Sequence, residues 1–170
     1  MRRLVWCLGM CVVLAAGCGS SDESAAELWC EGVCDAVARC ASQDVSCVTS
    51  CVQRTPALAN QSASGAAAQK PCLAQLSCQA ILGDDAAWQQ EQRACWDQAV
   101  MSVAVSDRAR QFCPDHALAW FECGYSLSLD DCEHIYSMWN DAVINRLALC
   151  DAKAHCDELD SCEQNVFDSL

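Results

Sequence analysis

Apolar and polar positions recur along most of this chain with the three-to-four-residue period of an amphipathic helix. Ser24 followed by Glu27 has the form of a helix capping box, and Asp44 can cap a second helix that ends before Pro56. Gly, Pro and Thr are scarce, with 7, 3 and 2 residues, whereas alanine occurs 27 times. Sandwiches and barrels need more turn-forming and β-branched residues than this, so the pattern predicts an all-α protein.

The remaining pattern predicts one loop and four further helices. Segment 56–69 is weakly amphipathic and rich in small residues, which indicates a long flexible loop. Pro114 should begin one of the helices, and Ser128 with Asp131 should cap the last one. The expected helices cover residues 71–82, 86–111, 114–125 and 129–153. We expect the apolar residues of the two longest helices, 86–111 and 129–153, to face the core, together with Phe112, which directly follows the first of them. They are Trp88, Cys95, Trp96, Val100, Val103, Phe112, Ile135, Met138, Trp139, Ala142, Ile144 and Leu147.

Residues 1–17 have the three parts of an export signal. Two arginines come first, an apolar run follows, and small residues precede Cys18. The apolar run is shorter than the roughly 20 residues that a permanent membrane span needs. We therefore expect this segment to be removed, and an ordinary signal peptide cleaved after Gly17 is one interpretation.

The sequence LAAGC over 14–18 resembles the lipobox of bacterial lipoproteins. The resemblance implies cleavage before Cys18 and acylation of that residue, so the lipid bilayer would be a partner through acyl chains on Cys18. Gly19 stands where lipoproteins retained in the inner membrane carry Asp, which implies the outer membrane. Residues 18–23 would form a tether that reaches about 20 Å, so the folded part should lie close to the bilayer.

The chain is acidic. It has 23 acidic and 10 basic residues, and loss of Arg2 and Arg3 with the signal leaves 8 basic residues and a net charge of −15. Nucleic-acid binding needs clusters of Lys and Arg, which the sequence lacks. An acidic surface favours solubility, and it would also suit a cationic ligand or a protein partner.

Cysteine accounts for 17 of the 170 residues, which is typical of exported proteins held by disulfides. Two cysteines belong to the signal and Cys18 would carry lipid, so 14 remain and can form seven disulfides. These 14 are Cys30, Cys34, Cys40, Cys47, Cys51, Cys72, Cys78, Cys95, Cys113, Cys123, Cys132, Cys150, Cys156 and Cys162.

Two cysteine pairs near the start of the folded part have helical spacing. Cys30 and Cys34 are four residues apart, as are Cys47 and Cys51, so each pair lies on one helix face. This twin Cys-x3-Cys pattern resembles the helical hairpins of small mitochondrial intermembrane-space proteins. The resemblance concerns architecture alone, and it implies Cys30–Cys51 and Cys34–Cys47 bridges and leaves Cys40 to pair elsewhere.

Two other cysteine pairs, Cys95 with Cys113 and Cys132 with Cys150, are each 18 residues apart. On one continuous helix such residues share a face but lie about 27 Å apart, so each should bridge to a neighbouring helix.

A loose internal repeat relates the two parts of the chain. We expect two related disulfide-stapled helical units, 24–110 with eight cysteines and 111–170 with six. Both counts are even, so each unit can close its own bridges, although spacing alone does not fix the pairing. The matched cysteines are Cys34, Cys40, Cys47, Cys72, Cys78 and Cys95 in the first unit and Cys113, Cys123, Cys132, Cys150, Cys156 and Cys162 in the second.

Known catalytic motifs are absent from the sequence. It has no Gly-x-Ser-x-Gly, no His-Glu-x-x-His, no phosphate-binding Gly loop and no Cys-x-x-Cys. We therefore expect no enzyme, no cofactor and no catalytic residue. Trp120, Phe121 and Tyr125 are candidates for a binding patch, although core packing is the default for the tryptophans.

Metal binding is the main alternative. The twin Cys-x3-Cys pairs fit the ligand spacing of zinc sites, but an exported protein more often oxidises such thiols, so disulfides are preferred and no metal ligand is assigned. The neighbourhood of His155 and Cys156 also offers carboxylates, on Asp151, Asp157, Glu158 and Asp160. We interpret His116, His134 and His155 as surface residues, and the acidic stretch Asp157, Glu158, Asp160 and Glu163 as a solvated helix face.

The sequence thus predicts an outer-membrane-anchored, disulfide-rich helical lipoprotein that acts as a non-catalytic binding or structural module of the cell envelope. It is similar in this respect to cysteine-rich bacterial lipoproteins with no assigned activity. An extracytoplasmic metal-binding or thiol-redox protein is the second hypothesis, and a hydrolase of unrecognised type is the third.

Overall fold

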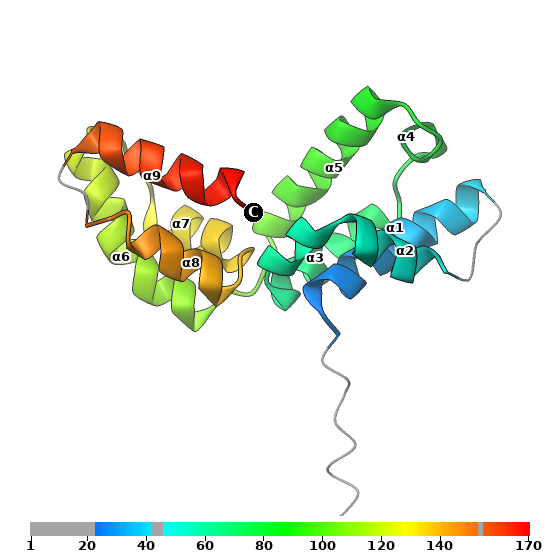
Figure 1. The fold of residues 1–170 in the computed structure, drawn as a ribbon, viewed down its shortest axis with the longest axis horizontal. Helices are drawn as coiled ribbons and strands as arrows, with labels where there is room; N and C mark the ends of the chain where they lie inside the picture. The colour runs from blue at the N-terminus through cyan, green and yellow to red at the C-terminus, as the bar shows by residue number, and fades with distance from the viewer. Residues whose placement is uncertain (1–22, 42–45, 153–154) are drawn as a thin grey trace, which may run out of the picture.

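The computed structural model describes residues 23–41, 46–152 and 155–170. Over these residues the protein is all-α, as predicted, and its helices are joined by disulfides. Figure 1 shows two groups of helices side by side, with the C-terminus at their junction. None of the described helices is both long enough and apolar enough to cross a membrane.

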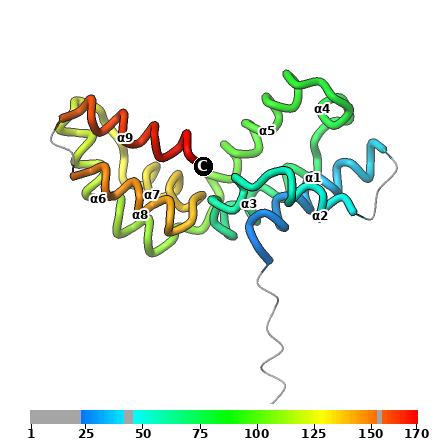
Figure 2. Tube along the Cα trace, viewed as in Figure 1, coloured from blue at the N-terminus to red at the C-terminus, as the bar shows by residue number. Residues whose placement is uncertain are grey.

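We call the two groups the first and the second unit. The first unit consists of α1 (Ala25–Cys40), α2 (Cys47–Arg54), the 3-10 helix η1 (Pro56–Asn60), α3 (Ala63–Leu73), α4 (Cys78–Ile81) and α5 (Asp85–Val100). The second unit consists of α6 (Asp107–Glu122), α7 (Leu129–Ser137), α8 (Asp141–Ala148) and α9 (Cys156–Asp168). In the first unit α1 packs against α2 and α3, and α5 packs against α3 and α4; in the second, α6 packs against α7 and α8, and α8 against α9. The tube in Figure 2 follows this order.

Two predicted helix starts are present. Ser24 accepts a hydrogen bond from the Glu27 backbone N–H, and Glu27 accepts one from the Ser24 backbone N–H, which completes the capping box of α1. Ser128 caps α7 by accepting from the Asp131 backbone N–H. Asp44, the predicted cap of the second helix, lies outside the described residues, and Ser46 occupies the N-cap position of α2.

The predicted loop over 56–69 is wrong. This segment forms η1 and most of α3, which begins where Ser62 accepts a hydrogen bond from the Gly65 backbone N–H. Small residues let α3 approach α1 closely: a Cβ added at Gly32 would lie 2.8 Å from the Lys70 carbonyl oxygen. Ala and Gly show little contrast between apolar and polar faces, so this packing left no amphipathic pattern in the sequence.

The predicted long helices are also wrong, because each is interrupted by a capping residue. The helix over 86–111 ends at Val100 and a new one starts after Ser106, so Pro114 lies inside α6 rather than at its start. The helix over 129–153 is broken after Ser137, where Asn140 caps α8. Ser and Asn side chains satisfy the first backbone N–H groups of a new helix, which favours a restart over continuation.

The helix expected over 71–82 is divided in the same way between the end of α3 and α4, which Ser77 caps. Cys95 and Cys113 therefore lie on different helices, and Cys150 lies beyond the end of α8 rather than on the helix that carries Cys132.

Seven disulfides join the 14 cysteines of the described residues. The hairpin pairing Cys30–Cys51 and Cys34–Cys47 is confirmed, and Cys40 pairs outside the hairpin. The other bridges are Cys40–Cys78, Cys72–Cys95, Cys113–Cys132, Cys123–Cys156 and Cys150–Cys162. Every bridge joins two residues of the same unit.

The disulfide pairing confirms the internal repeat. When the six matched cysteines of one unit are exchanged for their counterparts, Cys34–Cys47 becomes Cys113–Cys132, Cys40–Cys78 becomes Cys123–Cys156, and Cys72–Cys95 becomes Cys150–Cys162. Only the fourth bridge of the first unit, Cys30–Cys51, has no counterpart. The positions that correspond by spacing are Ala109 and Tyr136, which are both buried.

The two units meet through equivalent segments. Gln61 and Trp139 form an antiparallel bridge, with hydrogen bonds from Ser62 N to Met138 O (2.9 Å) and from Asn140 N to Asn60 O (3.0 Å). Cys72 and its counterpart Cys150 are 78 residues apart, and the same offset relates Gln61 to Trp139. The contact is therefore locally two-fold, with each unit contributing the segment that enters its third α-helix.

Candidate functional site

A buried histidine lies at the centre of a polar cluster in the second unit. His116 on α6 is 0% exposed. Its Nδ1 lies 2.8 Å from Asp151 Oδ1 and 3.7 Å from Glu163 Oε1, and its Nε2 shares a 2.8 Å hydrogen bond with the Tyr136 hydroxyl. Phe112, one turn earlier on α6, stacks on the imidazole with a centroid separation of 4.5 Å. The ring is thus held at both nitrogens and on one face.

Glu163 is the second buried member of this cluster. Trp120 Nε1 donates a 2.9 Å hydrogen bond to Glu163 Oε1. Burial raises the pKa of the Glu163 carboxyl, and the nearby His116 and the Trp120 hydrogen bond offset part of that rise. Burial likewise raises the pKa of the Tyr136 hydroxyl, with further contributions from Glu163 and Asp151. The second unit therefore keeps two carboxyl groups and a phenol in a poorly solvated space around one imidazole.

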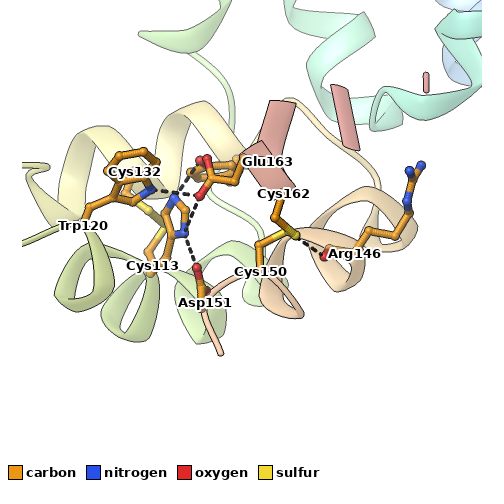
Figure 3. A network of polar contacts seen from close by, with 10 residues as sticks. Cys113, Trp120, Cys132, Arg146, Cys150, Asp151, Cys162 and Glu163 are labelled. Carbon is orange, nitrogen blue, oxygen red and sulfur yellow. Dashed lines mark hydrogen bonds and ion pairs between the residues drawn. A yellow bond between two sulfur atoms is a disulfide. The ribbon is translucent and has the colours of Figure 1, made fainter. Parts of the chain in front are cut away.

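Disulfides position the members of this cluster. Asp151 follows Cys150 directly and Glu163 follows Cys162 directly, so the Cys150–Cys162 bridge brings the two carboxylates together. On α6, His116 comes three residues after Cys113, which is bridged to Cys132 on α7. Figure 3 shows Asp151 and Glu163 converging next to these two disulfides, with Trp120 beside Glu163.

The hydrogen-bonding order carboxylate, imidazole, hydroxyl is that of a hydrolytic triad, but the surroundings do not suit catalysis. A catalytic hydroxyl must lose its proton to the imidazole and must be reachable by substrate. Tyr136 is buried in the core, and this burial raises the pKa of its hydroxyl, which disfavours loss of the proton. Because Tyr136 also covers His116 Nε2, this arrangement does not support the hydrolase hypothesis.

The donor atoms of His116, Asp151 and Glu163 are close enough to share a metal ion. One donor atom from each lies within 4.8 Å of the others. The side chains of Asp151 and Glu163 are each 11% exposed, so the cluster is not sealed. A surface cleft of about 420 Å³, which Arg108, Gln111 and Asp115 line with other residues, reaches Asp151.

The prediction that the histidines are surface residues is wrong for His116 and holds for His155, which is exposed at the start of α9. His134 is partly exposed and lies 4.0 Å from Asp130. In the predicted solvated face, Asp157, Glu158 and Asp160 are exposed but Glu163 is buried. Glu163 turns inward because it lies one turn after the core residue Leu159, on the face of α9 that packs on the unit.

The other residues that the sequence pointed to are not brought together as a site. Cys156, next to His155, is bridged to Cys123, and the twin Cys-x3-Cys pairs are bridged to each other rather than available to zinc. Phe121 and Tyr125 are 70% and 62% exposed, and Tyr125 contacts the ring of Trp120. Phe121 and Tyr125 are thus exposed near the end of α6, whereas Trp120 is partly buried and donates its indole N–H to Glu163.

The internal repeat is itself a sequence signal for the cluster. The repeat aligns Asp151 with Leu73 and Glu163 with Trp96, because each follows a matched cysteine, and it aligns His116 with Val37. Ionisable residues at positions where the sister unit has apolar ones indicate a polar group in a core. The single helix predicted over 129–153 had to be divided before that alignment could place all three residues in one space.

Comparison with known proteins gives no further guide to the site. No family model matches the sequence, and no similar protein was found among curated proteins or solved structures.

Proposed function

We propose that this protein is a lipid-anchored module of the bacterial cell envelope, attached through Cys18, that acts in binding or in structural support rather than in catalysis. The observation that carries the proposal is that every cysteine of the described residues is in a disulfide. Such complete pairing is stable in an oxidising compartment and rare in the cytosol. Export is the first requirement of the proposal, and the signal-like residues 1–17 would supply it.

The start of the folded part also supports attachment close to a membrane. The capping box at Ser24 fixes the beginning of α1 only six residues after Cys18. Ser24 and Ala25 border a groove of about 640 Å³ together with Trp139 and Asn140 of the second unit. A tether from Cys18 would therefore leave the fold at the junction of the two units, and both units would lie near the bilayer.

The anchor is tested by metabolic labelling with palmitate in a diderm bacterial host. We expect the wild-type chain to incorporate label and to fractionate with the outer membrane, and C18A to incorporate none. C11A is the matched control, because Cys11 lies inside the apolar run and its loss should leave labelling unchanged. Labelling of C18A at the wild-type level would refute the anchor site, and an unlabelled wild-type chain in the soluble periplasmic fraction would favour an ordinary signal peptide.

The thiol-redox version of the second hypothesis is tested by alkylation of the denatured, non-reduced protein followed by mass measurement. We expect no alkylated cysteine among the 14 that are bridged. A redox protein needs a labile pair, and recovery of two or more alkylated cysteines from this set would favour that function instead. The metal-binding version has separate support from the cluster around His116.

A further inference from the structure

We propose that His116, Asp151 and Glu163 bind one divalent transition-metal ion, with Zn²⁺ the best match to the donor set. One imidazole nitrogen and two carboxylate oxygens are the ligand types of three-residue zinc sites, in which water occupies the fourth position. This inference goes beyond the proposed envelope function and does not depend on the lipid anchor.

The distances fit such an ion after small side-chain adjustments. Zinc bonds to nitrogen and oxygen are 2.0–2.2 Å long, so tetrahedral ligand atoms lie about 3.3 Å apart. His116 Nδ1 is 2.8 Å from Asp151 Oδ1 and 3.7 Å from Glu163 Oε1, which places these separations on either side of that value. Movements of about half an ångström would bring these two separations to that value. The donor atoms of Asp151 and Glu163 lie within 4.8 Å of each other, and a shared ion would draw them together as well.

The surroundings of His116 are those of a metal-ligating histidine. Such a residue usually coordinates through one ring nitrogen and donates the N–H of the other to an oxygen. With Nδ1 toward the carboxylates, Nε2 would donate to the Tyr136 hydroxyl, 2.8 Å away. Trp120 Nε1 donates to Glu163 and would orient that ligand in the same way.

The sister unit shows that the fold does not need this polar cluster. Leu73 and Trp96 follow the matched cysteines Cys72 and Cys95, just as Asp151 and Glu163 follow Cys150 and Cys162. The same disulfide therefore forms over apolar neighbours. Two carboxylates around a single imidazole are costly to bury without a compensating charge, and a divalent cation supplies that charge.

The cluster is also preorganised and reachable. Three elements converge on it, because His116 lies on α6, Asp151 follows α8, and Glu163 lies on α9. The Cys113–Cys132 and Cys150–Cys162 bridges hold these elements in place before an ion arrives. The cleft beside Asp151 gives a hydrated ion a path to the site and leaves room for a bound water.

The test is metal binding by the full chain, purified in detergent, stripped with a chelator and dialysed. We expect equilibrium dialysis with Zn²⁺ to give one tightly bound ion per chain, and Co²⁺ to give the intense visible absorption of a four-coordinate site without a thiolate charge-transfer band. X-ray absorption of the zinc form should show a nitrogen and oxygen shell and no sulfur shell near 2.3 Å, where Zn–S bonds lie.

Isosteric variants locate the site. D151N and E163Q keep the size of each side chain, and each should weaken Zn²⁺ binding by more than about 100-fold, because loss of an outer-shell partner alone costs about 10- to 100-fold. E158Q is the matched control on α9 and H155A is the histidine control; both residues are exposed and both variants should bind as the wild type does. Zn²⁺ should raise the melting temperature of the wild type and of both controls, but not that of E163Q.

Three results would overturn the proposal. The first is a stripped wild-type chain that binds no stoichiometric Zn²⁺, which would leave the cluster as a structural hydrogen-bond network. The second is unchanged affinity in the D151N/E163Q double variant, which would place the ion elsewhere. The third is a sulfur shell in the absorption spectrum, and because this last measurement uses the wild type it decides the question even where a variant does not fold.

Discussion

The two units share a disulfide framework but differ in what it encloses. Three bridges of the first unit recur in the second with the same pairing. The first unit adds Cys30–Cys51, where the second has Ala109 and Tyr136 in its core. The second unit adds the cluster around His116, where the first has Val37, Leu73 and Trp96.

This difference separates the features that both units need for their fold, the three shared bridges, from the features that each unit has alone. The three shared bridges keep the same pairing over apolar and over polar neighbours alike. The helices that they join differ, because Cys78 and Cys95 lie on α4 and α5 whereas their counterparts Cys156 and Cys162 both lie on α9. The fourth bridge and the polar cluster are alternatives at related places: Cys51 corresponds to Tyr136, which holds His116. At these positions the first unit has a disulfide, whereas the second unit has a tyrosine that hydrogen-bonds to a buried histidine.

The largest effect should come from breaking a shared bridge, and the two units should respond alike. C40A/C78A opens a loop of 38 residues and C123A/C156A one of 33, so each should lower the free energy of unfolding by about 4 kcal/mol. C30A/C51A should cost less, about 2.5 kcal/mol, because Cys34–Cys47 already closes the hairpin inside it. Urea denaturation with fluorescence detection measures all three. A much smaller loss for C123A/C156A than for C40A/C78A would mean that the framework is not equivalent in the two units.

A substitution with an intermediate effect on stability should show that α1 approaches its neighbour more closely in the first unit than α6 does in the second. Gly32 lies two residues before Cys34, and a Cβ there would meet the Lys70 carbonyl oxygen at 2.8 Å and Leu73 at 3.0 Å. G32A should therefore push α1 away from α3 and cost about 2 kcal/mol. Gln111, two residues before Cys113, is exposed, so Q111A is the matched control in the second unit and should change the free energy of unfolding, measured by urea denaturation, by less than about 0.5 kcal/mol. Equal effects of the two substitutions would contradict the closer approach in the first unit.

Other parts of the fold show which features the sequence could predict and which it could not. Helical spacing and cysteine parity were sufficient to predict the fold class and the matched cysteines of the two units. The pairing within the hairpin came from the resemblance to known helical hairpins. The loop predicted over 56–69 failed because α3 packs through Gly65 and Ala66, which carry no amphipathic signal. Helix breaks at Ser106 and Asn140 were missed because a capping serine or asparagine also occurs on exposed helix faces.

The candidate site depended on those missed breaks. With 129–153 drawn as one helix, Asp151 would lie far along it from Tyr136, and nothing would bring either to His116. The structure turns the chain between α7 and α8 and again after Cys150, so that residues 20 to 47 positions from His116 in the sequence meet its ring. Pairing by disulfides supplies that geometry, and spacing alone does not fix the pairing.

A smaller effect on stability should come from adding to the second unit a helix cap that the first unit has. Ser77, the residue before Cys78, caps α4 by accepting from the Ala80 backbone N–H at 3.2 Å. His155, the residue before Cys156, holds the same extended backbone conformation at the start of α9 but makes no side-chain cap. H155S would create a capping box with Glu158 three residues on, and should stabilise the protein by about 1 kcal/mol. H155A is the control, and equal melting temperatures for H155S and H155A would show that the cap does not form.

The smallest effect is a pH dependence of stability, and it should distinguish two glutamates that occupy equivalent positions in the two units. Glu91, four residues before Cys95, accepts hydrogen bonds from the Ser77 hydroxyl at 2.5 Å and from the Ser77 backbone N–H at 2.7 Å. These hydrogen bonds hold the pKa of the Glu91 carboxyl below its ordinary value of 4.5. Because the folded-state pKa is the lower one, the contribution to stability is present above that ordinary value and is lost as the pH falls through the folded-state pKa.

E91Q should therefore lower the melting temperature at neutral pH, and its difference from the wild type should shrink as the pH is taken below 4.5, the ordinary pKa of the carboxyl. Glu158 stands four residues before Cys162 and is exposed, so E158Q serves as the counterpart in the second unit. Melting curves at a series of pH values measure both variants. Of the two glutamates, only Glu91 has a capping serine to bind. If the two substitutions gave the same pH profile, the hydrogen bonds from Ser77 to Glu91 would therefore not contribute to the pH dependence of stability.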